Sequence, residues 1–243
     1  MTQLSVNLNK IALLRNSRGR EFPNPCDFAR LAMKNGAVGV TIHPRPDERH
    51  ARYSDIQALQ NIVNEFEGKE LNIEGYPTDQ LNQAVLDVEP DQYTLVPDEP
   101  NQITSDHGWD LTKHFDFLKN TIAPFKNSKT RISLFLDPDK KQIDLAAKLG
   151  VERIELYTES YAVAFDQKNY AQVLEQFMIC ADYALSLGLE VNAGHDLDLE
   201  NLPEFVKKQN VDEVSIGHAL VVESLLNGFE DTIKKYVAIC NPA

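Results

Sequence analysis

The chain contains eight short apolar runs, and most of them end directly in a side chain that can move a proton or bind an anion. One helical pattern lies between each run and the next. Eight alternating strands and helices, with reactive groups at the carboxyl ends of the strands, predict a (β/α)8 TIM barrel with its active site at that end. The runs read as nearly continuous apolar segments, which is typical of buried parallel strands. They are LSVNLNK from Leu4, VTIH ending at His43, LNIE at Glu74, YTLVPDE from Tyr93, ISLFLD at Asp137, RIELYTE through Glu155, LEVNAGH at His195 and EVSIGH at His218.

The length favours one barrel domain over residues 1–243. The chain has 243 residues, and such barrels typically contain about 250. No apolar run reaches the roughly 18 residues that a membrane-spanning helix needs, and the N-terminus lacks the pattern of a signal peptide. The three cysteines are scattered and without CxxC spacing. We therefore expect a cytoplasmic location, a reducing compartment and no structural zinc.

The formal net charge of −13 restricts the partners of the chain. Nucleic acids and anionic membranes require a basic surface, so both are excluded as expected partners. A small anionic substrate remains compatible with this charge if a few arginine and histidine side chains converge locally.

Helix signals separate the predicted strands. The stretch 97–109 is the longest loop and follows the fourth strand, so we expect a functional loop or lid there. The segment 160–169 follows the sixth strand and is predicted as a second mobile cover. The helices are predicted to run over 24–34, from a cap at Ser54, from a cap at Thr78 to Pro90, from Pro138 to Gly150, over 170–187, and over about 222–239.

Two basic clusters follow the first and second strands. The segment His43-Pro-Arg-Pro-Asp-Glu-Arg-His50 carries two histidines and two arginines in eight residues. This composition suits anion binding and proton transfer at the carboxyl end of a barrel strand. After the first strand, Lys10, Arg15 and Arg18 have the charge needed to neutralise a phosphate dianion.

Carboxyl groups and histidines end the later strands. Glu74 and Glu155 lie in apolar surroundings, where a carboxylate is costly unless it is used or paired, for example with an arginine. His195 and His218 each follow a glycine, and the loops after strands seven and eight of this fold commonly bind phosphate. His43, His50, His195 and His218 could in principle bind zinc, but the first strand lacks the His-x-His pair of metal-dependent amidohydrolases, so we expect no metal.

Together these segments resemble the pyridoxine 5′-phosphate synthase family over essentially the whole chain. The most specific matches are VNLNKIALLRNSRG, VTIHPRPDERH, LNIE, LVPDEPNQIT, IELYTESYA, VNAGHDL and SIGHA. The resemblance implies a (β/α)8 barrel that condenses 1-deoxy-D-xylulose 5-phosphate with 3-amino-2-oxopropyl phosphate and releases phosphate and water. It also implies a cytoplasmic homo-octamer with two small phosphorylated substrates and no metal or organic cofactor.

The resemblance also implies roles for individual residues. His43 and Glu74 match the proton acceptors, His195 matches the proton donor, and Glu155 matches a carboxylate that stabilises the transition state. Contacts to the amino-ketone phosphate are implied for Asn7, Arg18, Gly217 and His218, and contacts to the deoxyxylulose phosphate for Arg45, His50 and Thr104. The chain differs from many family members at Asn9-Lys10, which replaces Asp-His in the deoxyxylulose phosphate site, and at Asp196, which replaces a glycine that contacts the amino ketone.

Two other functions remain open at this level. One is a phosphosugar aldolase or epimerase of the same fold, which would turn over a single substrate. The other is a non-catalytic protein that binds a phosphorylated metabolite, for which the departures at Asn9, Lys10 and Asp196 offer some support.

Overall fold

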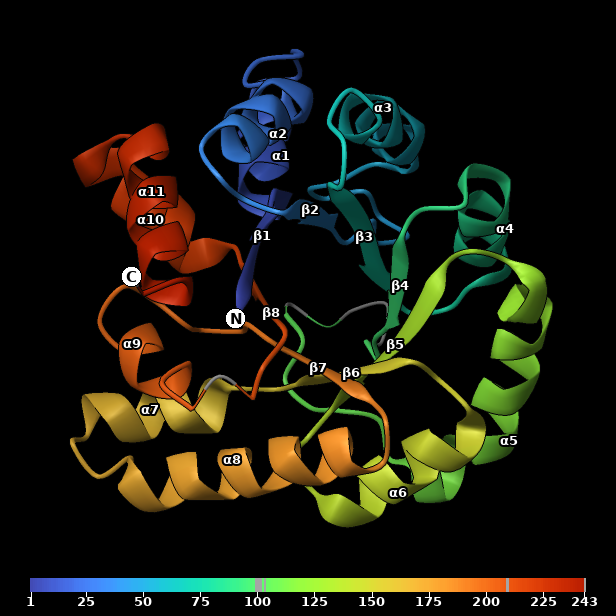
Figure 1. The fold of residues 1–243 in the computed structure, drawn as a ribbon. Helices are drawn as coiled ribbons and strands as arrows, with labels where there is room; N and C mark the ends of the chain where they lie inside the picture. Colours follow the sequence, from blue (N-terminus) through green and yellow to red (C-terminus); the bar gives the residue numbers. More distant parts are fainter. Residues whose placement is uncertain (99–101, 103, 209, 243) are drawn as a thin grey trace.

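The protein folds into a closed parallel barrel, and the predicted (β/α)8 fold is confirmed (Figure 1). The computed structural model describes residues 1–98, 102, 104–208 and 210–242. Each strand pairs with the next in parallel, and β8 closes the barrel against β1. The strands are β1 (Gln3–Asn7), β2 (Gly39–Ile42), β3 (Glu70–Gly75), β4 (Gln92–Leu95), β5 (Arg131–Leu136), β6 (Arg153–Leu156), β7 (Glu190–Ala193) and β8 (Glu213–Ile216).

Helices surround the barrel on its outer side (Figure 1). None of those in the described part of the chain is both long and apolar enough to cross a membrane. The helical segments are α1 (Asn9–Asn16), α2 (Pro25–Lys34), α3 (Tyr53–Val63), α4 (Asp79–Val88), α5 (Leu111–Ile122), the 3₁₀ turn η1 (Ala123–Asn127), α6 (Lys140–Leu149), α7 (Glu159–Asp166), α8 (Ala171–Ser186), α9 (Leu202–Phe205), α10 (His218–Asn227) and α11 (Phe229–Cys240).

Several predicted helix boundaries are confirmed by their capping contacts. The Asn24 side chain accepts a hydrogen bond from the backbone N–H of Cys26 at the start of α2, and Thr78 accepts one from Leu81 at the start of α4. Gly150 ends α6 with φ of +79°, a left-handed conformation that glycine adopts without strain. Short polar side chains therefore start these helices as the sequence indicates.

The segment 160–169 consists largely of α7, and Tyr161, which is fully buried, packs this helix against the core. Movement of this segment as a cover stays a prediction. Two helix predictions are wrong in detail. The helix predicted over 222–239 is two helices, α10 and α11, which separate at Gly228 with φ of +82°. Ser54 lies inside α3, because the Asp55 carboxylate accepts the N–H of Arg52 and the helix starts at Tyr53.

The strands alternate between apolar and polar residues, so the predicted continuous apolar pattern is also wrong. The apolar residues point outward and form the core with the helices, for example Leu4 and Val6 on β1. The residues between them point into the barrel and are mostly polar. These inward residues are Ser5, Asn7, Thr41, Glu70, Asn72, Glu74, Gln92, Thr94, Arg131, Ser133, Arg153, Glu155, Glu190, Asn192, Glu213 and Ser215.

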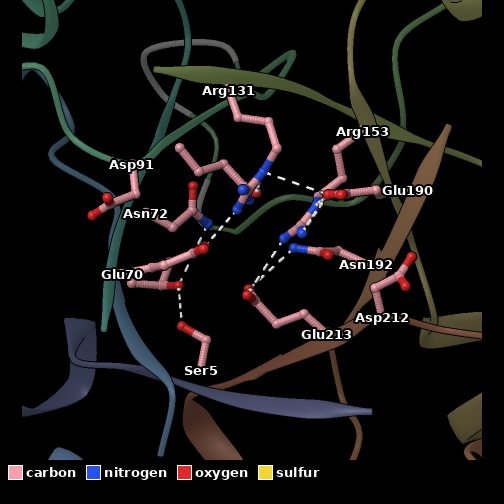
Figure 2. A network of polar contacts seen from close by, with 12 residues as sticks. Ser5, Glu70, Asn72, Asp91, Arg131, Arg153, Glu190, Asn192, Asp212 and Glu213 are labelled. Carbon is pink, nitrogen blue, oxygen red and sulfur yellow. Dashed lines mark hydrogen bonds and ion pairs between the residues drawn. The ribbon is translucent and has the colours of Figure 1, made fainter. Parts of the chain in front are cut away.

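Charged side chains fill the part of the barrel below the active-site end (Figure 2). Arg131 on β5 contacts Glu70 on β3 at 2.5 Å and Glu190 on β7 at 3.6 Å. Arg153 on β6 contacts Glu213 on β8 at 3.4 Å. These strands are not neighbours, so the contacts cross the interior. The interior of such barrels is usually packed with branched apolar residues, and here an ionic network takes their place.

Candidate active site

A cavity of about 410 Å³ opens at the carboxyl ends of the strands. It brings together the residues that the family resemblance implicates, with one exception. The exception is Arg18, which lies exposed in the turn after α1 and outside the lining of the cavity. The predicted residues in the lining are Asn7, Asn9, Lys10, His43, Arg45, His50, Glu74, Thr104, Glu155, His195, Asp196, Gly217 and His218.

His43 is held at the end of β2 with 5% of its surface exposed. Its backbone N–H donates to Asn9 Oδ1 at 2.9 Å, which ties the strand end to the start of α1. Its ring lies between two carboxyl groups, with Nδ1 3.8 Å from Glu74 Oε2 and Nε2 3.6 Å from Asp98 Oδ2. Burial lowers the pKa of His43 well below its usual value, and the arginines and histidine of the same loop lower it further. The imidazole is therefore neutral at physiological pH and can accept a proton.

Glu74 points into the cavity from β3. Its carboxyl oxygens lie 3.4 Å from Asn7 Nδ2 and 3.5 Å from Asn72 Nδ2. Burial raises the pKa of Glu74 well above its usual value, and the carboxyl groups of Glu155 and Asp98 raise it further. Among the described residues, asparagines and His43 surround this carboxyl group, and the arginine ion pair considered as an alternative is not formed. A buried carboxyl group of this kind is a stronger base than one in water.

Glu155 and His195 lie on the opposite side of the cavity, on β6 and after β7. Burial, followed by the charge of Glu213, raises the pKa of Glu155 to about 7. His195 Nε2 lies 3.2 Å from Thr104 Oγ1, and its carbonyl oxygen accepts a hydrogen bond from the Thr158 hydroxyl. Glu155 can therefore hold or release a proton near neutral pH, and His195 is oriented by contacts from two separate segments.

Asp196 has φ of +64°, in the left-handed region that favours glycine. Aspartate is one of the residues that enters this region most readily. Its carboxylate Oδ2 lies 3.0 Å from His195 Nδ1. Asp196 therefore places a negative charge next to a predicted proton donor.

Asp98 belongs to the site but was not among the predicted residues. Its side chain is buried, and Oδ2 accepts hydrogen bonds from Arg45 Nη2 and from Ser105 Oγ, the latter at 2.9 Å. Arg45 Nη1 also donates to the carbonyl of Gln102 at 3.1 Å. Asp98 thus fixes the predicted phosphate ligand Arg45 and the loop after β4. Its position directly after the fourth apolar run was the signal available in the sequence.

Arg15 is not a phosphate ligand in this structure, which corrects the prediction for the basic cluster after β1. Its side chain is fully buried and donates to both carboxylate oxygens of Asp55, at 2.6 and 2.9 Å, and to the carbonyl of His50 at 3.2 Å. Asn16 Nδ2 donates to the same carbonyl at 2.8 Å. The end of α1 therefore positions the loop that carries His50. Burial, with the nearby cations, lowers the pKa of that histidine to about 4.

Two helices begin with residues that line the cavity. α10 starts at His218, directly after Gly217, and α1 starts at Asn9. The N-terminus of a helix favours anions because its N–H groups and dipole are both positive there. A Cβ at position 217 would lie 3.1 Å from the Asn7 Cβ, so glycine allows this close approach of β8 to β1. The wall of the cavity therefore contains two helix starts that favour a negative charge.

Part of the loop predicted as a lid, residues 99–101 and 103, lies outside the described residues. The described part places Thr104 and Ser105 in the cavity wall, and Trp109 Nε1 donates to the Leu95 carbonyl at 2.9 Å. Whether this loop moves stays a prediction. In the described part of the chain, no three His, Cys, Asp or Glu side chains converge as a metal site would require.

Solved structures of low sequence identity share this fold. Tryptophan synthase from M. tuberculosis superposes with a TM-score of 0.64 at 9% identity, covering 100% of this chain and 94% of that one. Phosphoribosylanthranilate isomerase from Thermotoga maritima gives 0.55 at 12% identity over 100% of both chains. The fold and the acid–base groups at its carboxyl end define the class, an enzyme of the (β/α)8-barrel type.

Sequence relatives define the family within that class. The family model described as "Pyridoxal phosphate biosynthesis protein PdxJ" matches residues 4–242. The pyridoxine 5′-phosphate synthase of Christiangramia forsetii is 52% identical over 98% of this chain and 99% of its own. That of Agrobacterium fabrum is 46% identical over 98% and 97%. The chain belongs to the PdxJ family of vitamin B6 biosynthesis, and the predicted family is confirmed.

Proposed function

We propose that this protein is a pyridoxine 5′-phosphate synthase that condenses 1-deoxy-D-xylulose 5-phosphate with 3-amino-2-oxopropyl phosphate, with loss of phosphate and water. The observation that carries the proposal is the meeting of two histidines and two carboxyl groups in one cavity, with the pKa of His43 lowered and those of Glu74 and Glu155 raised. Ring closure requires several proton transfers, and each needs an acid or base within reach. Membership of the family supports the same pair of substrates.

The geometry supports distinct roles for these four groups. The amine of one substrate attacks the ketone of the other, so the substrate supplies the nucleophile and no catalytic lysine is needed. The neutral imidazole of His43 and the ionised carboxylate of Glu74 are placed to accept protons during imine formation and ring closure. His195 is placed across the cavity to donate a proton to the leaving oxygen. When Glu155 is ionised, its carboxylate stabilises the positive charge that develops on the substrate nitrogen.

The two phosphates are assigned to the two helix N-termini. We assign the amino-ketone phosphate to the start of α10, with Gly217, His218 and Asn7. Arg18, the remaining family-implied ligand, would have to reach this phosphate from its exposed position. We assign the deoxyxylulose phosphate to the start of α1 and the neighbouring basic residues of the lining, with Arg45, His50, Thr104, Asn9 and Lys10.

We further propose a cytoplasmic homo-oligomer, an octamer as the family resemblance implies, that uses no metal or organic cofactor. Two leucines of α10, Leu225 and Leu226, are 77% and 88% exposed. Val222 of α10 is also exposed, and so are Leu13 and Leu14 of α1, a helix that contacts α10. An exposed apolar patch of this kind supports burial against another copy of the chain. Sedimentation analysis tests the assembly, and a monomer at micromolar concentration would contradict it.

The function is tested by mixing the purified protein with both substrates in the presence of a chelator. Inorganic phosphate and pyridoxine 5′-phosphate are followed together. Formation of both products supports the proposal, including the absence of an essential metal. Turnover of one phosphosugar alone would instead indicate an aldolase or epimerase. Binding by calorimetry without any product would indicate a non-catalytic binding protein.

A further inference from the structure

Three polar residues on successive strands lie side by side in the barrel, and the first of them, Glu155, lines the cavity. Glu155 on β6 is the register partner of Asn192 on β7, and Asn192 is the register partner of Glu213 on β8. Register partners in a parallel sheet point to the same face, so all three side chains face the barrel interior. Their exposed fractions are 4%, 0% and 3%, so all three are buried.

The hydrogen bonds of Glu213 determine how the Asn192 amide is turned. Glu213 Oε1 accepts from Asn192 Nδ2 at 3.1 Å, and Oε2 lies 3.4 Å from Arg153 Nη1 (Figure 2). Both oxygens of Glu213 therefore accept hydrogen bonds, as an ionised carboxylate does, and the carboxylate selects the NH₂ end of the amide. Burial raises the pKa of Glu213, and the charges of Arg153 and Arg131 oppose that shift. The carbonyl oxygen of Asn192 is therefore turned away from Glu213.

This orientation leaves two buried acceptors without a donor on neighbouring positions. Asn192 Oδ1 and Glu155 Oε2 both lack a hydrogen-bond partner among the described residues. Two acceptors cannot satisfy each other, and an unsatisfied buried polar atom costs about 1–3 kcal/mol. A proton on Glu155 turns that carboxyl group into a donor for which a neighbouring acceptor is already present.

Some charges around Glu155 favour its ionised form and others oppose it. Arg153 of the same strand and His195 from the end of β7 favour its ionised form, whereas Glu213 from β8 opposes it. Glu74, which faces Glu155 from β3, is a further carboxyl group in the same site. Arg153 is already engaged by Glu190 at 2.8 and 2.5 Å and by Glu213, which limits its effect on Glu155.

We propose that Asn192 and Glu213 are positioning residues that hold Glu155 protonated, as a hydrogen-bond donor, in the resting enzyme. Glu213 fixes the Asn192 amide, and the Asn192 carbonyl then accepts from the Glu155 carboxyl group. Glu155 enters the reaction as an acid and becomes the stabilising carboxylate only after it has released its proton. The use of that proton in turnover rests on the proposed function, but the protonation itself does not.

The test follows the Glu155 carboxyl group directly in the ligand-free protein. Infrared difference spectra across pH detect the carbonyl stretch of a protonated carboxyl group, and the Glu155 band is assigned by its loss in Glu155→Gln. In the wild type this band should titrate near pH 7. Glu213→Gln and Asn192→Ala should each move its midpoint to lower pH by about one unit, the effect of removing one like charge or one acceptor from a buried site.

Glu190→Gln is the matched control. It makes the same chemical change at a carboxylate that also holds Arg153, but Glu190 is half exposed and is not in register with Glu155. It should leave the midpoint where it is. Equal midpoints in Glu213→Gln and Glu190→Gln, or no protonated band in the wild type at pH 6, would overturn the proposal. If Glu213→Gln does not fold, Asn192→Ala provides the same comparison with the ion pair intact.

The kinetic readout separates this proposal from the proposed function. The pH profile of kcat/KM should shift with the infrared midpoint in the two positioning variants and stay unshifted in Glu190→Gln. An inactive wild type would refute the function, yet the infrared titration would still decide the protonation of Glu155.

Discussion

The Glu155→Gln substitution tests whether the active-site carboxyl group destabilises the folded protein when it ionises. The pKa of Glu155 is about 7 in the folded protein, against 4.5 for an ordinary glutamate. The folded state therefore holds the proton more tightly than the unfolded state does. The resulting stability is fully present below pH 4.5 and is lost as the pH rises through 7. The pKa difference corresponds to about 3 kcal/mol of unfolding free energy.

Glutamine cannot ionise, so the variant should not lose this stability at high pH. Urea unfolding of both proteins at pH 5 and pH 8 measures the effect. The variant should gain about 2–3 kcal/mol relative to the wild type between these two conditions. Glu67→Gln, at an exposed turn, is the control and should show no such change. If the difference in unfolding free energy between Glu155→Gln and wild type is the same at pH 5 and pH 8, the raised pKa assigned to Glu155 is refuted.

Three further predictions concern the reaction, the buried ion pair and the barrel wall. Glu74→Gln should keep its circular dichroism spectrum and lower kcat by about 10²–10⁴, the usual contribution of a general base; near-normal turnover would remove Glu74 from the mechanism. Asp55→Ala leaves the buried Arg15 guanidinium without its carboxylate and should lower the free energy of unfolding by about 3–5 kcal/mol; a loss below about 1 kcal/mol in urea unfolding would contradict this. Gly194→Ala would place a Cβ 2.1 Å from the Ser215 carbonyl oxygen. Tm should therefore fall by at least about 4 °C. An unchanged Tm would show that β7 and β8 separate freely.

The barrel fold and the residues that line its active-site cavity could be predicted, because both follow from the order of apolar runs and reactive residues along the sequence. Parallel strands in a barrel all present their carboxyl ends on one side. Residues that directly follow an apolar run, such as His43, Glu74 and His195, must therefore meet in space. This rule does not depend on the details of packing, which is why these residues line one cavity.

The role of each arginine could not be predicted in the same way. Arg15 and Arg18 are three residues apart in one basic cluster, yet Arg15 is buried against Asp55 and Arg18 is exposed. The direction of a side chain on α1 and the position of a carboxylate forty residues away decide this difference. Asp98 was missed for a related reason, because its importance comes from its contacts with Arg45 and Ser105.

The polar interior was missed because apolar residues dominate each run when it is read as a whole. In the strand ELNIEG the leucine and isoleucine point to the helices, and Glu70, Asn72 and Glu74 point inward. Only the period of two separates the faces, and short strands of four to six residues show this period weakly. Which partner compensates each inward charge depends on cross-barrel contacts such as that of Arg131 with Glu190.

The central claim is that one cavity joins two phosphorylated substrates through its own acid–base groups. The most direct measurement is the stoichiometry of a reaction with limiting substrates, together with omission of each substrate in turn. The account predicts one inorganic phosphate for each pyridoxine 5′-phosphate formed, and neither product when one substrate is left out. Release of phosphate or conversion of the sugar from 1-deoxy-D-xylulose 5-phosphate alone would contradict it.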